Sequence, residues 1–149
     1  MERLVATNKK AYHDFFIEET FEAGIQLVGS EVKSIRLGGI NLKDSYAYIK
    51  NGEIILSNVH ISPYKMGSYF NVDPRRDRRL LMHKREIDKL RGKIEQKGYT
   101  LVATKVYFKN SLIKIEIALA KGKELHDKRD ALKEKQQKRE VLRELANYK

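Results

Sequence analysis

Two predicted β-hairpins constrain the fold of this chain more than any other feature of its sequence. The first places residues 45–49 and 53–56 on either side of Asn51-Gly52. Both turn residues tolerate the positive φ angles that a type I′ turn requires, so this pair is a strong signal for two antiparallel strands.

The second hairpin is longer. Residues 100–108 and 112–119 are rich in β-branched and aromatic side chains, and Lys, Asn and Ser lie between them. Ile113, Ile115 and Ile117 alternate with charged residues, which predicts one buried face and one solvent face.

Helical patterns interrupt the strands twice. Ser30 is predicted to cap a short helix that ends at Gly38-Gly39. A longer helix is predicted over residues 84–97, where apolar residues recur every three or four positions and Gly98 follows.

The number and order of these elements favour one fold class. Residues 15–22 and 25–28 add either a strand pair or one long strand bent at Gly24. Short antiparallel strands without regular crossover helices fit an open α/β sheet poorly. We therefore expect a mainly β protein, an oligonucleotide-binding (OB)-type antiparallel barrel with two or three helices and a basic C-terminal tail.

Charge indicates the kind of partner. The 149 residues include 31 Lys and Arg against 20 Asp and Glu, a net charge of +11. Such an excess favours a polyanion, and RNA or DNA is the first expectation. The absence of cysteine excludes a disulfide scaffold and thiol chemistry. No run is apolar enough for a membrane span or a signal peptide, so we expect a cytoplasmic protein.

The chain divides near Gly122. Residues 1–122 are predicted to form the barrel, and residues 123–149 a basic tail with only a thin apolar stripe. Such a stripe cannot bury enough surface to hold a helix alone, so we expect the tail to be disordered in isolation and helical against RNA. An inert solubilising tail is the alternative.

No enzyme motif stands out. The four histidines, His13, His60, His83 and His126, show no metal-ligand spacing, and there is no phosphate-binding glycine motif. We therefore expect no catalytic residues, no metal and no cofactor.

Basic residues are densest over residues 75–93, which contain nine Lys and Arg and three Asp and Glu. A solvated charged face is the ordinary explanation of such a cluster. The density here favours contacts with phosphates, whose counterion release makes binding weaken with salt.

Seven segments together resemble one family. They are residues 8–12, 16–25, 29–34, 41–46, 60–64, 80–87, and 118–123 followed by Asp127-Lys128-Arg129. In order along nearly the whole chain, they resemble the bacterial small protein B family, the SsrA-binding proteins.

The resemblance implies the function and the partners. Members bind transfer-messenger RNA, which rescues stalled ribosomes by trans-translation. The barrel would bind the tRNA-like domain, and the tail would enter the empty mRNA channel and decoding centre. Elongation factor Tu would be an indirect partner, the protein a monomer, and no enzyme activity, metal, cofactor or membrane would be involved.

The resemblance also implies the residues that contact RNA. In the barrel they are Asn8, Lys9, Lys10, Glu31, Lys33, Arg36, Lys43, His83, Lys84, Arg85, Lys121 and Lys123. Glu31 has two interpretations, an acceptor for a base edge or 2′-hydroxyl, or a buried partner of a basic neighbour.

In the tail, the residues implied to contact the ribosome are His126, Asp127, Lys128, Arg129, Lys133, Lys135, Lys138, Arg139 and Arg143. Glu124 stands where the family often has a second lysine, which puts a contact there in doubt.

Three other functions remain open. The first is a general single-stranded nucleic-acid-binding OB-fold protein without preference for a tRNA-like fold. The second is an RNA-processing enzyme that uses His13 or His83. The third is a structural protein of the ribosome.

Overall fold

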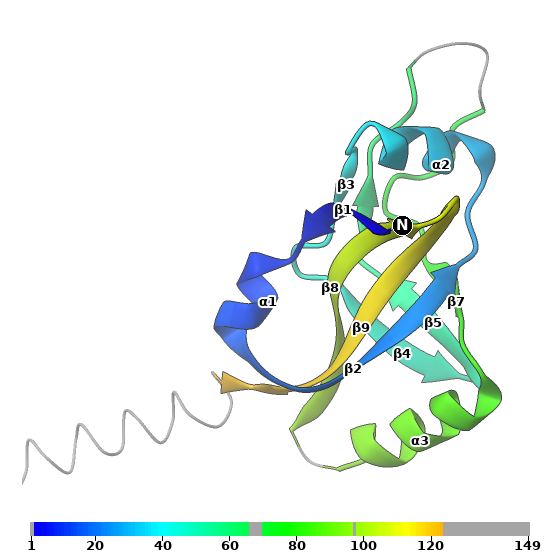
Figure 1. Cartoon of the computed structure of the whole chain (residues 1–149). Coiled ribbons are helices and arrows are strands. Elements are labelled where there is room, and N and C mark those ends of the chain that lie inside the picture. The colour runs from blue at the N-terminus through cyan, green and yellow to red at the C-terminus, as the bar shows by residue number, and fades with distance from the viewer. Residues whose placement is uncertain (1, 66–69, 97, 124–149) are drawn as a thin grey trace, which may run out of the picture.

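In the computed structural model, which describes residues 2–65, 70–96 and 98–123, the strands wrap into a barrel (Figure 1). The helices are α1 (Lys9–Asp14), α2 (Gly29–Arg36) and α3 (Lys84–Ile94). The strands are β1 (Glu2–Thr7), β2 (Phe15–Ile25), β3 (Ile40–Asn41), β4 (Tyr46–Lys50), β5 (Glu53–Ser57), β6 (His60–Ile61), β7 (Arg78–Leu81), β8 (Tyr99–Lys109) and β9 (Leu112–Gly122). The tail beyond residue 123 lies outside the described residues, and so do the predictions made for it.

Both predicted hairpins are confirmed. β4 and β5 pair antiparallel, and Asn51 and Gly52 between them have φ angles of 53° and 75°. β8 and β9 pair along almost their whole length, up to Lys109 opposite Leu112. Both hairpin turns contain an asparagine at positive φ. In the turn between β8 and β9 this residue is Asn110, with a φ of 57°.

The strands close into a ring. Their order is β8-β4-β5-β7-β2-β9, and β9 pairs back onto β8. Each pairing in the ring is antiparallel, and β1 pairs with the last residues of β8. The predicted mainly β, OB-type antiparallel barrel is therefore confirmed, and its three helices lie within the predicted two or three.

The barrel interior is the hydrophobic core. Ile54, Leu101 and Ile117 come from three strands and are fully buried. Ile35 of α2 and Leu90 of α3 join the same cluster, and Figure 1 shows these two helices at opposite ends of the barrel. Burying such a side chain contributes about 1.5–3 kcal/mol to the stability of the fold. Each of the two helices therefore covers the core at one end of the barrel and stabilises it.

β2 is one continuous strand, which settles the alternative left open by its sequence. Gly24 pairs with Lys114 of β9 on one side and with Leu81 of β7 on the other. A Cβ at position 24 would lie 3.3 Å from the Leu81 Cβ, so the close approach of β7 favours glycine.

The helices differ from the prediction in three respects. α1 was not predicted. Ser30 lies inside α2, and Val28 is the N-cap residue. Valine has no acceptor, but the Glu31 side chain accepts a hydrogen bond from the Val28 N–H and forms half of a capping box. α3 ends at Ile94 instead of Lys97. Within the described ranges no helix is long and apolar enough to cross a membrane.

Candidate nucleic-acid interface

The barrel residues predicted to contact RNA fall into four groups. Those with exposed or half-buried side chains lie on α1 and the turn before β4 (Lys9, Lys10, Lys43), on α2 (Lys33, Arg36), at the start of α3 (His83, Lys84, Arg85) and at the end of β9 (Lys121, Lys123). Because α2 and α3 lie at opposite ends of the barrel, these groups do not share one face (Figure 1).

Asn8 is buried, with 5% of its surface exposed. Its Oδ1 accepts a hydrogen bond from the Ala11 N–H and caps α1. Its Nδ2 donates to the carbonyl oxygens of Leu42 and Ala103, both at 2.9 Å. The side chain of Asn8 thus joins α1 to the barrel, and its predicted RNA contact stays a prediction.

Replacing Asn8 by alanine is expected to lower the free energy of unfolding by about 2–3 kcal/mol. The variant loses a helix cap, worth about 1 kcal/mol, and the two amide hydrogen bonds to the buried carbonyl groups of Leu42 and Ala103, although the Leu42 carbonyl keeps its bond from the Ser45 N–H. Chemical denaturation followed by circular dichroism measures the loss. Lys9→Ala, in the same helix but exposed, is the matched control and should stay within about 0.5 kcal/mol of the parent chain. An equally stable Asn8→Ala variant would contradict this assignment.

Lys10 and Asp44 connect α1 to the turn before β4. Lys10 Nζ lies 2.6 Å from Asp44 Oδ1, and the ammonium lowers the pKa of that carboxyl below its ordinary value. Lys9 and Lys43 on the same side are exposed, so their charges remain accessible to phosphate groups.

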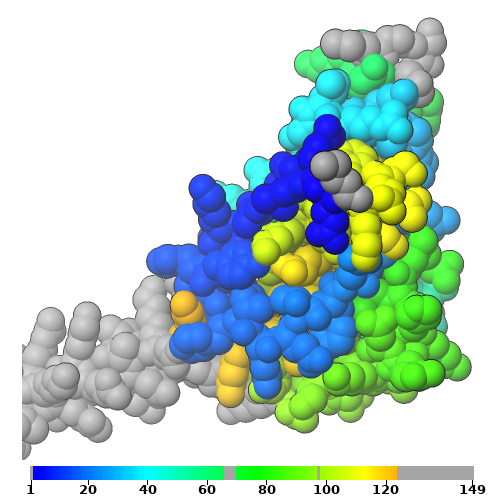
Figure 2. Space-filling view, in the orientation of Figure 1, coloured from blue at the N-terminus to red at the C-terminus, as the bar shows by residue number. Residues whose placement is uncertain are grey.

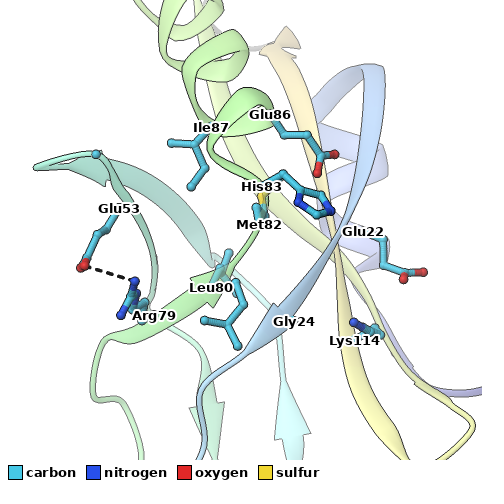
Figure 3. A pocket seen from close by; sticks show the side chains of 12 residues that line it. Glu22, Gly24, Glu53, Arg79, Leu80, Met82, His83, Glu86, Ile87 and Lys114 are labelled. Carbon is cyan, nitrogen blue, oxygen red and sulfur yellow. Dashed lines mark ion pairs between the residues drawn. The ribbon is translucent and has the colours of Figure 1, made fainter.

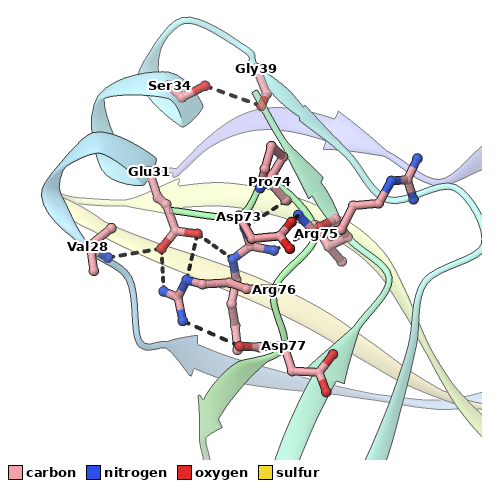
Figure 4. A network of polar contacts seen from close by, with 11 residues as sticks. Val28, Glu31, Ser34, Gly39, Asp73, Pro74, Arg75, Arg76 and Asp77 are labelled. Carbon is pink, nitrogen blue, oxygen red and sulfur yellow. Dashed lines mark hydrogen bonds and ion pairs between the residues drawn. The ribbon is translucent and has the colours of Figure 1, made fainter. Parts of the chain in front are cut away.

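Glu31 lies at the centre of a buried polar network (Figure 4). Only 3% of its surface is exposed. Its carboxylate accepts hydrogen bonds from Nε and Nη2 of Arg76 and, at 2.6 Å, from Nε of Arg78. Arg78 is itself 1% exposed and donates to the carbonyl oxygens of Val59 and Pro74. The guanidinium group of Arg78 therefore has a partner on each side.

The network keeps Glu31 ionised. Burial raises its pKa, but hydrogen bonds from Arg76, the Val28 N–H and Arg78 outweigh that effect, so the net pKa falls below its ordinary value. Of the two interpretations of Glu31, the structure supports the buried partner of basic neighbours. The predicted RNA contact of Glu31 stays a prediction.

The same network changes the interpretation of the basic cluster at residues 75–93. Arg76 and Arg78 are paired with Glu31, and Arg79 Nη2 lies 3.3 Å from Glu53. Part of the cluster's charge is thus balanced inside the protein. Lys84 and Arg85, at the start of α3, remain exposed.

A cavity of about 560 Å³ lies beside His83, between β2, β7 and the first turn of α3 (Figure 3). Its walls combine the carboxylates of Glu22 and Glu86 with the cationic side chains of Arg79 and Lys114. The cavity therefore offers both acceptors and donors next to the predicted RNA-binding residues of α3.

Glu22 lines this cavity but was not among the residues predicted from the sequence to contact RNA. The Tyr107 hydroxyl donates to Glu22 Oε2 at 2.5 Å, and Lys109 Nζ lies 3.4 Å from the same carboxylate. Chiefly through the Tyr107 hydrogen bond, the pKa of Glu22 falls below its ordinary value. The sequence signal was the alternation along β2, which places Glu22 on the outer face of the barrel.

Two lysines at the end of β9 rest on aromatic rings. Lys121 Nζ lies 5.5 Å from the Tyr99 ring centroid, and Lys123 Nζ lies 4.9 Å from that of Phe16. Figure 2 shows the end of β9, in orange, next to the blue residues of α1 and β2. These cation–π contacts join the end of β9 to β8 and β2, the strands that carry the two rings.

The structure does not bring the histidines of the enzyme alternative together. His13 is exposed on α1, and its Nδ1 lies 3.0 Å from Asp14 of the same helix. His83 precedes α3, at another part of the barrel (Figure 1). Over residues 2–65, 70–96 and 98–123, no three His, Asp or Glu side chains are grouped to hold a metal ion.

Comparison with known proteins identifies the family. The sequence pattern that describes the SmpB protein matches residues 5–147. The chain belongs to the SmpB family. An SsrA-binding protein of Caldicellulosiruptor bescii is 57% identical over 146 residues, covering 98% of this chain and 92% of the relative. The SsrA-binding protein of Clostridium acetobutylicum is 60% identical over 143 residues, covering 96% and 92%.

A solved structure agrees with this membership. A chain from the structure described as "tmRNA-SmpB: a journey to the center of the bacterial ribosome" is 51% identical to this SmpB family member. The TM-score is 0.68, over 79% of this chain and 83% of that chain. The family resemblance drawn from the seven sequence segments is confirmed.

Proposed function

We propose that this chain is an RNA-binding protein of bacterial trans-translation that binds the tRNA-like domain of transfer-messenger RNA. The observation that carries the proposal is the match of nearly the whole chain to relatives named SsrA-binding proteins. The structural neighbour, described together with tmRNA and the bacterial ribosome, supports the same function.

The accessible cations of the barrel are the proposed RNA contacts. They are Lys9, Lys10, Lys33, Arg36, Lys43, Lys84, Arg85, Lys121 and Lys123, together with His83 beside its cavity. Lysine and arginine contacts to phosphates position an RNA without reading its sequence. This chemistry suits recognition of a folded tRNA-like shape.

The remaining steps belong to the same proposal. The protein delivers the RNA to a stalled ribosome, with elongation factor Tu as an indirect partner. Its tail, from His126 to Arg143, occupies the empty mRNA channel and the decoding centre. It acts in the cytoplasm as a monomer and as a non-enzymatic factor.

A binding titration tests the RNA preference. The full chain is titrated at one moderate salt concentration with the tRNA-like fragment of transfer-messenger RNA, with an ordinary tRNA and with an unstructured RNA. We expect at least tenfold tighter binding to the tRNA-like fragment, a difference of about 1.4 kcal/mol. Equal binding to all three RNAs would contradict the proposal and favour the general single-strand binder.

A further inference from the structure

A second cavity, of about 740 Å³, lies where β1, the end of α2 and the turn between β8 and β9 come together. Its lining residues are Glu2, Arg3, Arg36, Phe108, Asn110 and Ser111. Figure 1 shows the N-terminus and this turn next to α2. The volume is within the range of small-molecule and cofactor sites, about 300–1,000 Å³.

Arg3 covers the aromatic ring of this cavity. The pairing of β1 with β8 places Arg3 opposite Phe108, and the guanidinium carbon of Arg3 lies 4.9 Å from the centroid of the Phe108 ring. Phe108 is buried, whereas Arg3 is exposed. The cation–π contact thus holds the guanidinium group over the ring and leaves its outer side to solvent. A flat RNA base can stack on that side.

The positive charge of this cavity is not balanced. Arg3 and Arg36 form no ion pair and no hydrogen bond with any residue of the described ranges. The arginines of β7 and of the loop before it are instead held by carboxylates and carbonyl groups. Among the lining residues Glu2 is the one carboxylate. Two guanidinium groups therefore outnumber it, and a guanidinium group suits phosphate because it donates two parallel hydrogen bonds.

These features together match a nucleotide better than an acidic peptide. A phosphate would satisfy Arg36, and a base would cover the outer side of Arg3. Asn110 and Ser111 add an amide and a hydroxyl group to the same wall. An acidic peptide would use the two charges but not the flat surface. The nucleotide has to be unpaired, because a base inside a helix is stacked on its neighbours.

The position of the cavity indicates which RNA supplies the nucleotide. Ser111 lies just before β9, and the tail begins just after Gly122 at the other end of this strand. The 11 residues of β9 span about 35 Å, at about 3.3 Å per residue. With the tail in the decoding centre, the cavity lies far from that site and is accessible to the tRNA-like domain.

We propose that this cavity binds one unpaired nucleotide of the tRNA-like domain, with its phosphate on Arg36 and its base stacked on Arg3. The inference rests on the proposed RNA-binding function and deepens it.

Titrations of the full chain with the tRNA-like fragment at several salt concentrations test the two roles. Arg36→Ala should weaken binding by about five- to tenfold and lower the salt slope by about 1, because one phosphate contact is lost. Arg3→Lys should weaken binding by about fivefold or more with the salt slope unchanged, because it keeps the charge but removes the stacking surface. Lys50→Ala is the matched control. It removes one exposed cation that does not line the cavity, and it should bind within about twofold of the parent chain.

Backbone amide NMR of the full chain locates the site, with AMP, inorganic phosphate and hexaglutamate as probes. We expect AMP to shift the amide signals of Arg3, Asn110 and Ser111 more than either other probe does. Equal shifts with inorganic phosphate would overturn the role of the base. Equal shifts with hexaglutamate would overturn the nucleotide in favour of an acidic protein.

The outcomes separate this inference from the proposed function. If the parent chain does not bind the tRNA-like fragment, the proposed function fails. If it binds, and Arg3→Lys and Arg36→Ala bind as tightly, the site is wrong while the function stands. The same variants are titrated with small ribosomal subunits. A loss of affinity there, without a loss for the tRNA-like fragment, would overturn the assigned source of the nucleotide.

Discussion

Replacing Glu31 by alanine is expected to lower the free energy of unfolding by about 3–5 kcal/mol, the cost of leaving a buried charge without its partner. Arg78 is 1% exposed and relies on Glu31 as its only ion-pair partner among the described residues. The loss is measured by urea denaturation followed by circular dichroism. It amounts to a fifth or more of the stability of a typical domain, which is about 5–15 kcal/mol.

Glu53→Ala is the matched control for this prediction. The ion pair of Glu53 with Arg79 is about half exposed on both sides and should contribute no more than about 1 kcal/mol. RNA affinity provides a second measurement. If Glu31→Ala folds as stably as the parent chain and loses only RNA affinity, then Glu31 is an RNA contact and the structural role is wrong.

The same network makes the stability of the protein depend on pH in a defined direction. The pKa of Glu31 is lower in the folded protein than its ordinary value of 4.5, so the unfolded chain takes up the proton first as pH falls. The stability contributed by ionised Glu31 is complete above pH 4.5 and declines as pH falls from there through the folded pKa. The stability difference between the parent chain and Glu31→Gln should therefore be largest at neutral pH and shrink in acid.

Local chemistry explains why the barrel was predictable. The hairpin at Asn51-Gly52 and the alternation around Ile115 depend on residues that are neighbours in the sequence, so turn type and strand face can be inferred directly. α1 escaped prediction because six residues give too short a pattern. Its stability comes from Asn8, whose partners Leu42 and Ala103 are 34 and 95 residues away.

Distance along the chain also explains why the buried network around Glu31 was not predicted. Glu31 and Arg78 are 47 residues apart, and nothing near either residue indicates that they meet. The sequence does contain one sign that Arg78 is buried. Strand alternation places Arg78 on the same face as Leu80, which points into the barrel. An arginine on a core face needs a buried carboxylate, and Glu31 is the one that reaches it.

Shortening the chain to end at Lys123 is expected to separate RNA binding from ribosome rescue. The hydrophobic core and the proposed RNA contacts of the barrel all lie within residues 2–123. Keeping Lys123 preserves its contact with Phe16. Affinity for the tRNA-like fragment should therefore stay within about threefold of the full chain.

Rescue should instead fall by about 100-fold or more, because the deletion removes the tail cations proposed to contact ribosomal phosphates, from Lys128 to Arg143. The measurement is tagging of a nascent peptide during translation of a message without a stop codon. A full-length chain whose tail residues are shuffled in order is the matched control, since it keeps the charge of the tail and alters its pattern. If the shuffled tail supports rescue as well as the natural one, the tail acts by charge alone. If the shortened chain loses affinity for the tRNA-like fragment, the division between barrel and tail is wrong.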